Sequence, residues 1–228
     1  MSVPAAAQEG GDLQAQITYA YQTEDLGRLR SLRQSLADQV RGEHATTAAR
    51  YHLAHADYRL GLLLRSRRQA AAQPLQECAS QLSELDQGEA VSAEVLALQA
   101  ICWMELAGER KLQAVFLRSR AVEALQRAAR ADARNPRVKL GQALQQLAVA
   151  GDAGPVPPEL ERAAELFEHS PATNEEAPGW GHAECYLLMG HALRVRGDEL
   201  GARNWLEKAL IIAPDYKAAQ AEIAQLNR

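Results

Sequence analysis

The stretch Tyr186–Pro214, YLLMGHALRVRGDELGARNWLEKALIIAP, decides the fold of this chain. Gly190 interrupts an apolar helical pattern, where glycine costs about 1 kcal/mol relative to alanine, so a close backbone contact is the reason to expect it there. Ala202 and Ala209 supply a small surface on the following segment. Gly197 separates the two segments and Pro214 ends the second. The stretch therefore predicts two closely packed helices joined as a hairpin.

The same two signatures alternate four times along the chain. The first-helix signature, an apolar residue followed by a small one, recurs at Leu60-Gly61-x2-Leu64 and Leu140-Gly141-x2-Leu144. It recurs at Leu96-x3-Ala100-x2-Trp103 with alanine in place of glycine and with Gln99 where an apolar residue is expected. The second-helix signature recurs at Ala71-x3-Leu75, Ala121-x3-Leu125 and Ala163-x3-Phe167. The second helix that carries Ala71-x3-Leu75 should begin close to Pro74, because proline belongs in a first helical turn.

This alternation resembles the tetratricopeptide repeat (TPR) family, whose pattern W-x2-L-G-x2-Y…A-x3-F…P spans about 34 residues. The matching positions are Tyr186, Met189, Gly190, Leu193, Ala202, Leu206 and Pro214. The resemblance covers residues 45–226 and implies an all-α, right-handed α-solenoid of TPR-like hairpins. The repeats are longer than the family average, and we assign the excess to an early-starting helix over residues 109–120 and to loops at 151–158 and 170–181.

The predicted organisation has four parts. Residues 1–10 are expected to be disordered, and residues 11–44, which share the helical period but lack the motif, to form an N-terminal capping hairpin. Residues 45–214 form four TPR-like repeats. Residues 215–228 form a C-terminal capping helix, since the last repeat cannot bury its own apolar face.

Composition excludes several classes of protein. The net charge of −4 and the lack of aromatics among the arginine-rich segments argue against nucleic-acid binding. No apolar run is long enough for membrane insertion. The N-terminus lacks the basic and apolar regions of a signal peptide, which predicts a cytoplasmic protein. The alternative is a periplasmic one, because VPAAAQ (residues 3–8) resembles the end of a signal peptide. The odd count of three cysteines predicts buried, reduced thiols.

Residue patterns predict neither an enzyme nor a cofactor or metal site. There is no nucleophile or phosphate-binding motif. His182 and Cys185 share a helical face, but His191 turns away from it. His52 and His55, one turn apart, would need further ligands, so we interpret them as polar residues beside tyrosines.

The remaining candidate site is the concave groove that first helices line in the TPR family. By this resemblance, the groove and partner-binding residues are His55, Tyr58, Leu62, Arg65, Glu94, Ile101, Met104, Gln142, Gln145, Gln146, Glu184, Leu187, His191 and Arg194. The set lacks the Lys and Asn clamp by which some family members hold a C-terminal carboxylate. The expected function is a scaffold or adaptor that binds a protein or peptide partner. The alternative is a self-associating structural subunit, which would make the protein a homo-oligomer.

Overall fold

The structure is a computed structural model that describes residues 5–42, 45–87, 92–151, 154–169 and 179–227. These residues form eleven α-helices and one short 3₁₀ helix, with no strand among them. The helices are α1 (Ala5–Gln22), α2 (Leu26–Arg41), α3 (Thr47–Ser66), α4 (Ala72–Leu85), α5 (Ala93–Glu109), α6 (Ala114–Ala131), α7 (Pro136–Ala150), α8 (Pro158–His169), α9 (His182–Val195), α10 (Glu199–Ile212) and α11 (Lys217–Leu226), and the 3₁₀ helix is η1 (Lys111–Gln113).

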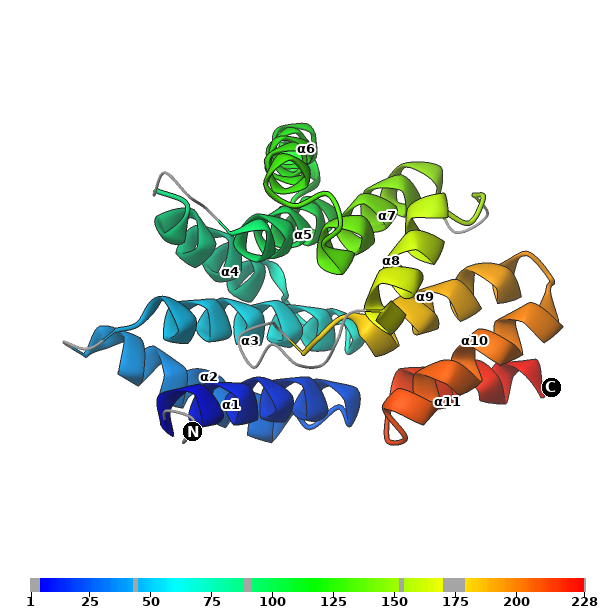
Figure 1. Cartoon of the computed structure of the whole chain (residues 1–228), viewed down its shortest axis with the longest axis horizontal. Coiled ribbons are helices and arrows are strands. Elements are labelled where there is room, and N and C mark those ends of the chain that lie inside the picture. Colours follow the sequence, from blue (N-terminus) through cyan, green and yellow to red (C-terminus); the bar gives the residue numbers. More distant parts are fainter. Residues whose placement is uncertain (1–4, 43–44, 88–91, 152–153, 170–178, 228) are drawn as a thin grey trace.

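Consecutive helices pack in pairs, as the sequence predicts (Figure 1). α3 packs on α4, α5 on α6, α7 on α8 and α9 on α10, while α1 and α2 precede these four hairpins and α11 covers α9 and α10. The first helix begins at Ala5 and so extends into the segment for which disorder is predicted. Asp25 lies in the turn between α1 and α2. Its side chain accepts the Arg28 backbone N–H at 2.9 Å and thereby caps the start of α2.

Three glycines allow close contacts between helices. A Cβ atom on Gly61 would lie 2.6 Å from Leu75 Cγ, one on Gly141 would lie 2.7 Å from Leu125 Cδ2, and one on Gly190 would lie 2.5 Å from Leu206 Cγ. For Gly61 and Gly190 the leucine comes from the second helix of the same hairpin, whereas Gly141 on α7 faces a leucine of α6, the second helix of the preceding hairpin. The first and last hairpins therefore share the packing contact that the spacing predicts, and Gly141 serves the contact between two successive hairpins.

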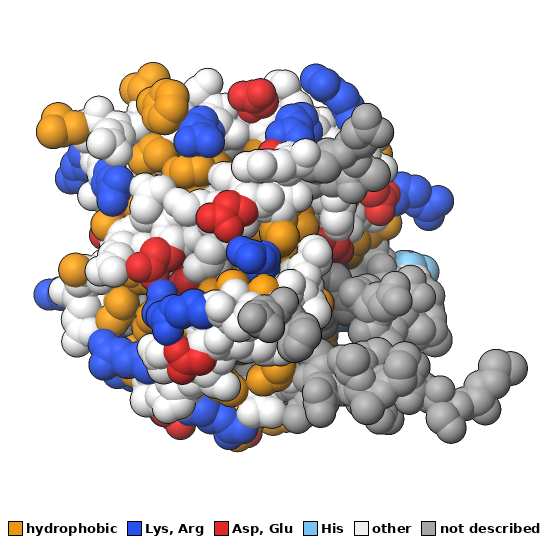
Figure 2. All heavy atoms as spheres, turned by 90° about the vertical axis from the view of Figure 1, so that its left-hand side faces the viewer, with side chains coloured by type: hydrophobic (Ala, Val, Ile, Leu, Met, Phe, Trp, Pro, Cys, Tyr) orange, Lys and Arg blue, Asp and Glu red, His pale blue; other side chains and the backbone are white. Residues whose placement is uncertain are grey.

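The structure describes two of the three predicted irregular segments, because most of the predicted loop at 170–181 lies outside the described residues. α4 begins two residues before Pro74, and α7 and α8 are separated by residues 151–157. α6 begins at Ala114, two turns before its signature residue Ala121. This helix lies at the top of the molecule in Figure 1. In the turned view of Figure 2, hydrophobic side chains project at the top of the molecule, beside Lys and Arg side chains.

The prediction that the cysteines are reduced is wrong for two of them. Cys78 on α4 and Cys102 on α5 form a disulfide with a Cα–Cα distance of 6.2 Å, and only Cys185 is a free, buried thiol. The helical pattern places each cysteine in the core, but their pairing depends on the contact between α4 and α5. The bond links the α3–α4 hairpin to the α5–α6 hairpin.

Contacts between distant parts of the chain add to this sequential packing. The Tyr19 hydroxyl on α1 donates to Asp215 Oδ2 at 3.2 Å, and the rings of Tyr21 and Tyr216 lie 6.2 Å apart. The Gly179 backbone N–H donates to Gln14 Oε1 at 3.1 Å. The N-terminal hairpin therefore lies against the residues that flank α9 and α10.

Candidate functional site

The predicted groove residues lie on α3, α5, α7 and α9, the first helices of the four hairpins. The structure distributes them between a buried inner network and a more open end. His55, Tyr58 and Ile101 are buried and Glu184 nearly so, whereas Gln146 is exposed. The partly exposed members are Leu62, Arg65, Glu94, Met104, Gln142, Gln145, Leu187, His191 and Arg194.

Arg59 is the centre of the inner network. Its side chain on α3 is only 1% exposed, and its Nη2 donates to Glu184 Oε1 on α9 at 2.5 Å. Its Nε donates to His55 Nε2 at 3.0 Å, and its guanidinium carbon lies 4.5 Å from the centre of the Tyr21 ring. A charge buried this deeply requires a partner, so the ion pair joins α3 to α9.

The network keeps His55 neutral. Because Nε2 accepts from Arg59, the ring proton is on Nδ1. Burial, together with the positive charge of Arg59, holds the pKa of His55 well below its ordinary value of 6.5. A neutral imidazole can therefore accept from the arginine without repelling it.

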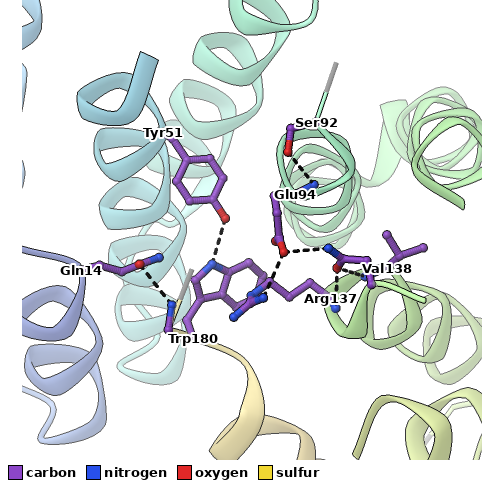
Figure 3. A network of polar contacts seen from close by, with 9 residues as sticks. Gln14, Tyr51, Ser92, Glu94, Arg137, Val138 and Trp180 are labelled. Atoms are coloured by element: carbon purple, nitrogen blue, oxygen red, sulfur yellow. Dashed lines mark hydrogen bonds and ion pairs between the residues drawn. The ribbon is translucent and has the colours of Figure 1, made fainter. Parts of the chain in front are cut away.

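Trp180 fills the space between the first helices (Figure 3). Its indole Nε1 donates to the Tyr51 hydroxyl at 2.9 Å, and its ring stacks on His55 with the ring centres 5.4 Å apart. The guanidinium carbons of Arg59 and Arg137 lie 5.5 and 5.3 Å from the Trp180 ring, which is a favourable cation–π arrangement. A segment of the chain itself thus occupies the inner face on which the sequence places a partner.

A second, partly buried ion pair borders Trp180 in Figure 3. Glu94 on α5 accepts from Arg137 Nη1 at 3.0 Å and from Asn135 Nδ2 at 2.7 Å. Asn135 also caps α7 by accepting the Arg137 and Val138 backbone N–H groups. Glu94 therefore ties the start of α5 to the start of α7.

Other predicted groove residues are held by local partners. His191 Nδ1 and Arg194 Nε contact Glu222 of α11 at 3.0 and 2.5 Å. Gln142 accepts from the Lys139 amine at 3.1 Å, and Gln146 Nε2 donates to Glu159 Oε2 at 2.7 Å. These contacts attach α9 to the terminal helix and α7 to α8.

Arg65, Met104 and Gln145 line an open hollow. It has a volume of about 250 Å³ and also contacts Glu105, Gly108, Arg118, Val122, Ala148 and Val149. Arg65 forms an ion pair with Glu105 on its wall. The hollow therefore brings together three predicted groove residues from α3, α5 and α7 with two residues of α6.

Val149 lines this hollow, and three further large apolar side chains in η1 and at the start of α6 are also exposed. Leu112 is fully exposed, Val115 is 84% exposed, Phe116 is 64% exposed and Val149 is 81% exposed. We name Leu112, Val115, Phe116, Val149 and the hollow together the α6 surface. The sequence predicts the early start of α6, but it does not identify this surface. The signal available was the run of aliphatic and aromatic residues in the segment that lengthens the helix beyond its repeat.

Arg59 and Trp180 are the central residues that the groove prediction omits. Arg59 directly precedes the apolar run Leu60–Leu64 in the middle of α3, and a charge at such a position of a buried helix is a signal for a buried partner. Within the part of the chain that the structure describes, no three His, Cys, Asp or Glu side chains gather as metal ligands would. Nor does any helix in that part have the length and apolarity needed to cross a membrane.

Comparison with known proteins gives no assignment. No protein-family model matches the sequence, and no curated protein is similar to it.

Proposed function

We propose that this chain is a protein-interaction module, a scaffold or adaptor that binds a partner protein on the α6 surface. The observation that supports it is the set of exposed apolar side chains Leu112, Val115 and Phe116 on η1 and the start of α6, the helix that also contributes Arg118 and Val122 to the hollow beside the exposed Val149. Apolar side chains gain about 25 cal/mol for each Å² removed from water, and exposed apolar groups of this kind mark interaction sites.

The proposal retains the TPR-like, right-handed solenoid as its architecture and moves the binding site from the first helices to η1, α6 and the hollow that α6 shares with α3, α5 and α7. The contacts of Gly61 and Gly190 within their hairpins support the repeat interpretation. Trp180 and the Arg59–Glu184 pair fill the inner face near α3 and α9, which leaves the end lined by Arg65, Met104 and Gln145 open to a partner.

The test is a capture experiment with matched variants. The intact chain is immobilised, and bound proteins are compared for the native sequence, for Leu112→Ser with Phe116→Ser, and for Ile211→Ser. Ile211 on α10 is 81% exposed and serves as the control for loss of an exposed aliphatic residue. A partner that is lost only with the α6 variant supports the proposal, and one retained by all three variants contradicts it.

A self-associating subunit is the second candidate, because α10 carries another apolar group. Leu200 and Ile211 are largely exposed and Ile212 is partly so. Sedimentation at several concentrations tests this function: a mass that rises with concentration in the native chain, but not in Leu200→Ser with Ile211→Ser, supports it. The disulfide between Cys78 and Cys102 favours an oxidising compartment for either function, in agreement with the periplasmic alternative.

A further inference from the structure

We infer that the α6 surface binds an amphipathic helix whose apolar face is flanked by carboxylates. This inference rests on the proposed function and specifies the chemistry of the partner.

The spacing of the exposed residues suits a helix. Leu112 of η1 and Val115, Phe116 and Ser119 of α6 lie three or four residues apart, so they form one stripe along η1 and the start of α6. Val122 lies one turn further and faces the hollow. A hollow of about 250 Å³ is smaller than the roughly 300–1,000 Å³ of small-molecule sites, and it suits one or two large side chains. A partner cannot bind here by adding a strand to a sheet, because the described residues contain no strand.

The rim of the stripe is basic. The charged side chains around it are Arg65, Glu105, Glu109, Arg110, Lys111, Arg118, Arg120 and Glu123. Five of these eight are basic, in a chain whose net charge is −4. The one carboxylate that lines the hollow, Glu105, is already paired with Arg65. Lys111 and Arg118 have no carboxylate partner among the described residues, so an acidic flank on the bound helix would complement them.

A second copy of this chain fits the rim less well. The charged residues of α10 beside its exposed apolar group are Glu199, Arg203, Glu207 and Lys208, whose charges sum to zero. The helix α10 therefore offers no net negative charge of its own to complement a basic rim. Charge therefore favours a separate, acidic partner.

Two synthetic peptides test the inference against the full chain. Both have eighteen residues with leucine on one helical face, and they carry either glutamate or lysine along its two edges. Fluorescence anisotropy of the labelled peptides gives their affinities at low and moderate salt. We expect the glutamate peptide to bind at least about tenfold more tightly than the lysine peptide, and this difference to shrink with salt.

Variants locate the binding and its charge preference. Phe116→Ser should weaken the glutamate peptide about tenfold, and Ile211→Ser should not affect it. Lys111→Glu with Arg118→Glu should reverse the preference in favour of the lysine peptide. Equal binding of the two peptides, or a preference that survives this charge reversal, overturns the inference. If neither peptide binds while Leu112→Ser with Phe116→Ser still abolishes capture of a cellular partner, the inference fails and the proposed function stands. Concentration-dependent self-association that Phe116→Ser abolishes would identify a second copy as the occupant and also overturn it.

Discussion

Replacing Glu184 with glutamine should destabilise the fold far more than loss of one surface charge would. Glutamine keeps the size of Glu184 and can still accept the Gly181 backbone N–H, which lies 2.9 Å from its carboxylate. It removes the negative charge that compensates Arg59, whose side chain is 1% exposed. Breaking a buried pair by removing one partner costs about 3–5 kcal/mol. Total stabilities are about 5–15 kcal/mol, so this is a large fraction.

Urea unfolding followed by circular dichroism measures the effect. With an m-value near 3 kcal/mol/M, a loss of 3 kcal/mol lowers the midpoint by about 1 M. Arg59→Met combined with Glu184→Gln should be more stable than Glu184→Gln alone, because no unpaired charge remains buried. The control is Glu84→Gln, which breaks the exposed Arg50–Glu84 pair and should cost less than about 0.5 kcal/mol.

Additive effects of Arg59→Met and Glu184→Gln on the free energy of unfolding would refute this reasoning, because paired residues should show a coupling of about 0.5–3 kcal/mol. An effect of Glu184→Gln no larger than that of Glu84→Gln would refute it as well.

Three further predictions concern packing, pH and the disulfide. Gly190→Ala should destabilise the fold by about 1–3 kcal/mol, because its Cβ would lie 2.5 Å from Leu206 Cγ. Gly108→Ala, whose Cβ would have its nearest atom 3.8 Å away, should be neutral or slightly stabilising. Similar melting temperatures for the two variants would argue against the hairpin contact. Folding lowers the pKa of His55 below its ordinary value of 6.5. As the pH falls below 6.5, the unfolded chain therefore binds a proton at His55 while the folded chain does not. The free energy of unfolding should then drop towards pH 5. Urea midpoints at pH 7 and pH 5 should show a smaller drop for His55→Gln, and equal drops would contradict this role. Reduction of the Cys78–Cys102 bond should lower stability by about 3 kcal/mol for a loop of this length, and an unfolding curve unchanged by reductant would show that the bond does not contribute.

Local features of the fold could be predicted from the sequence because their causes are local. Gly61 and Gly190 interrupt apolar helices ahead of a leucine on the next helix, and the structure shows each of them against that leucine, whereas Gly141 lies against Leu125 on the preceding helix. Gly197 and Pro214 end helices by their backbone chemistry alone, wherever the helices pack.

The inner network could not be predicted because its partners are distant in sequence. Arg59 and Glu184 are 125 residues apart, and Trp180 and Tyr51 are 129 apart. A repeat pattern identifies which side of a helix faces the groove, but it does not place the last hairpin against α3. For this reason His55 and Tyr58 are groove residues by position and core residues by burial.

The candidate site could be predicted only in part, because only some of its residues lie on the first helices that the repeat pattern identifies. Arg65, Met104 and Gln145 line the hollow because each lies near the end of a first helix, where side chains on the inner face remain open. The exposed residues of α6 belong to the segment that exceeds the repeat length. A family pattern contains no position for such a segment, so the resemblance could not assign it a role.

The contacts that join the two ends of the chain affect how it folds. A stack in which each repeat contacts only its neighbours can lose its terminal repeats one at a time. Here the loss of α1 would also break the bonds from Tyr19 to Asp215 and from Gln14 to Gly179, which close loops of 196 and 165 residues. Closing such long loops slows folding, since their entropy is lost before the contacts form. The same contacts couple the unfolding of the two ends. The chain should therefore unfold more cooperatively, and fold more slowly, than an open repeat array.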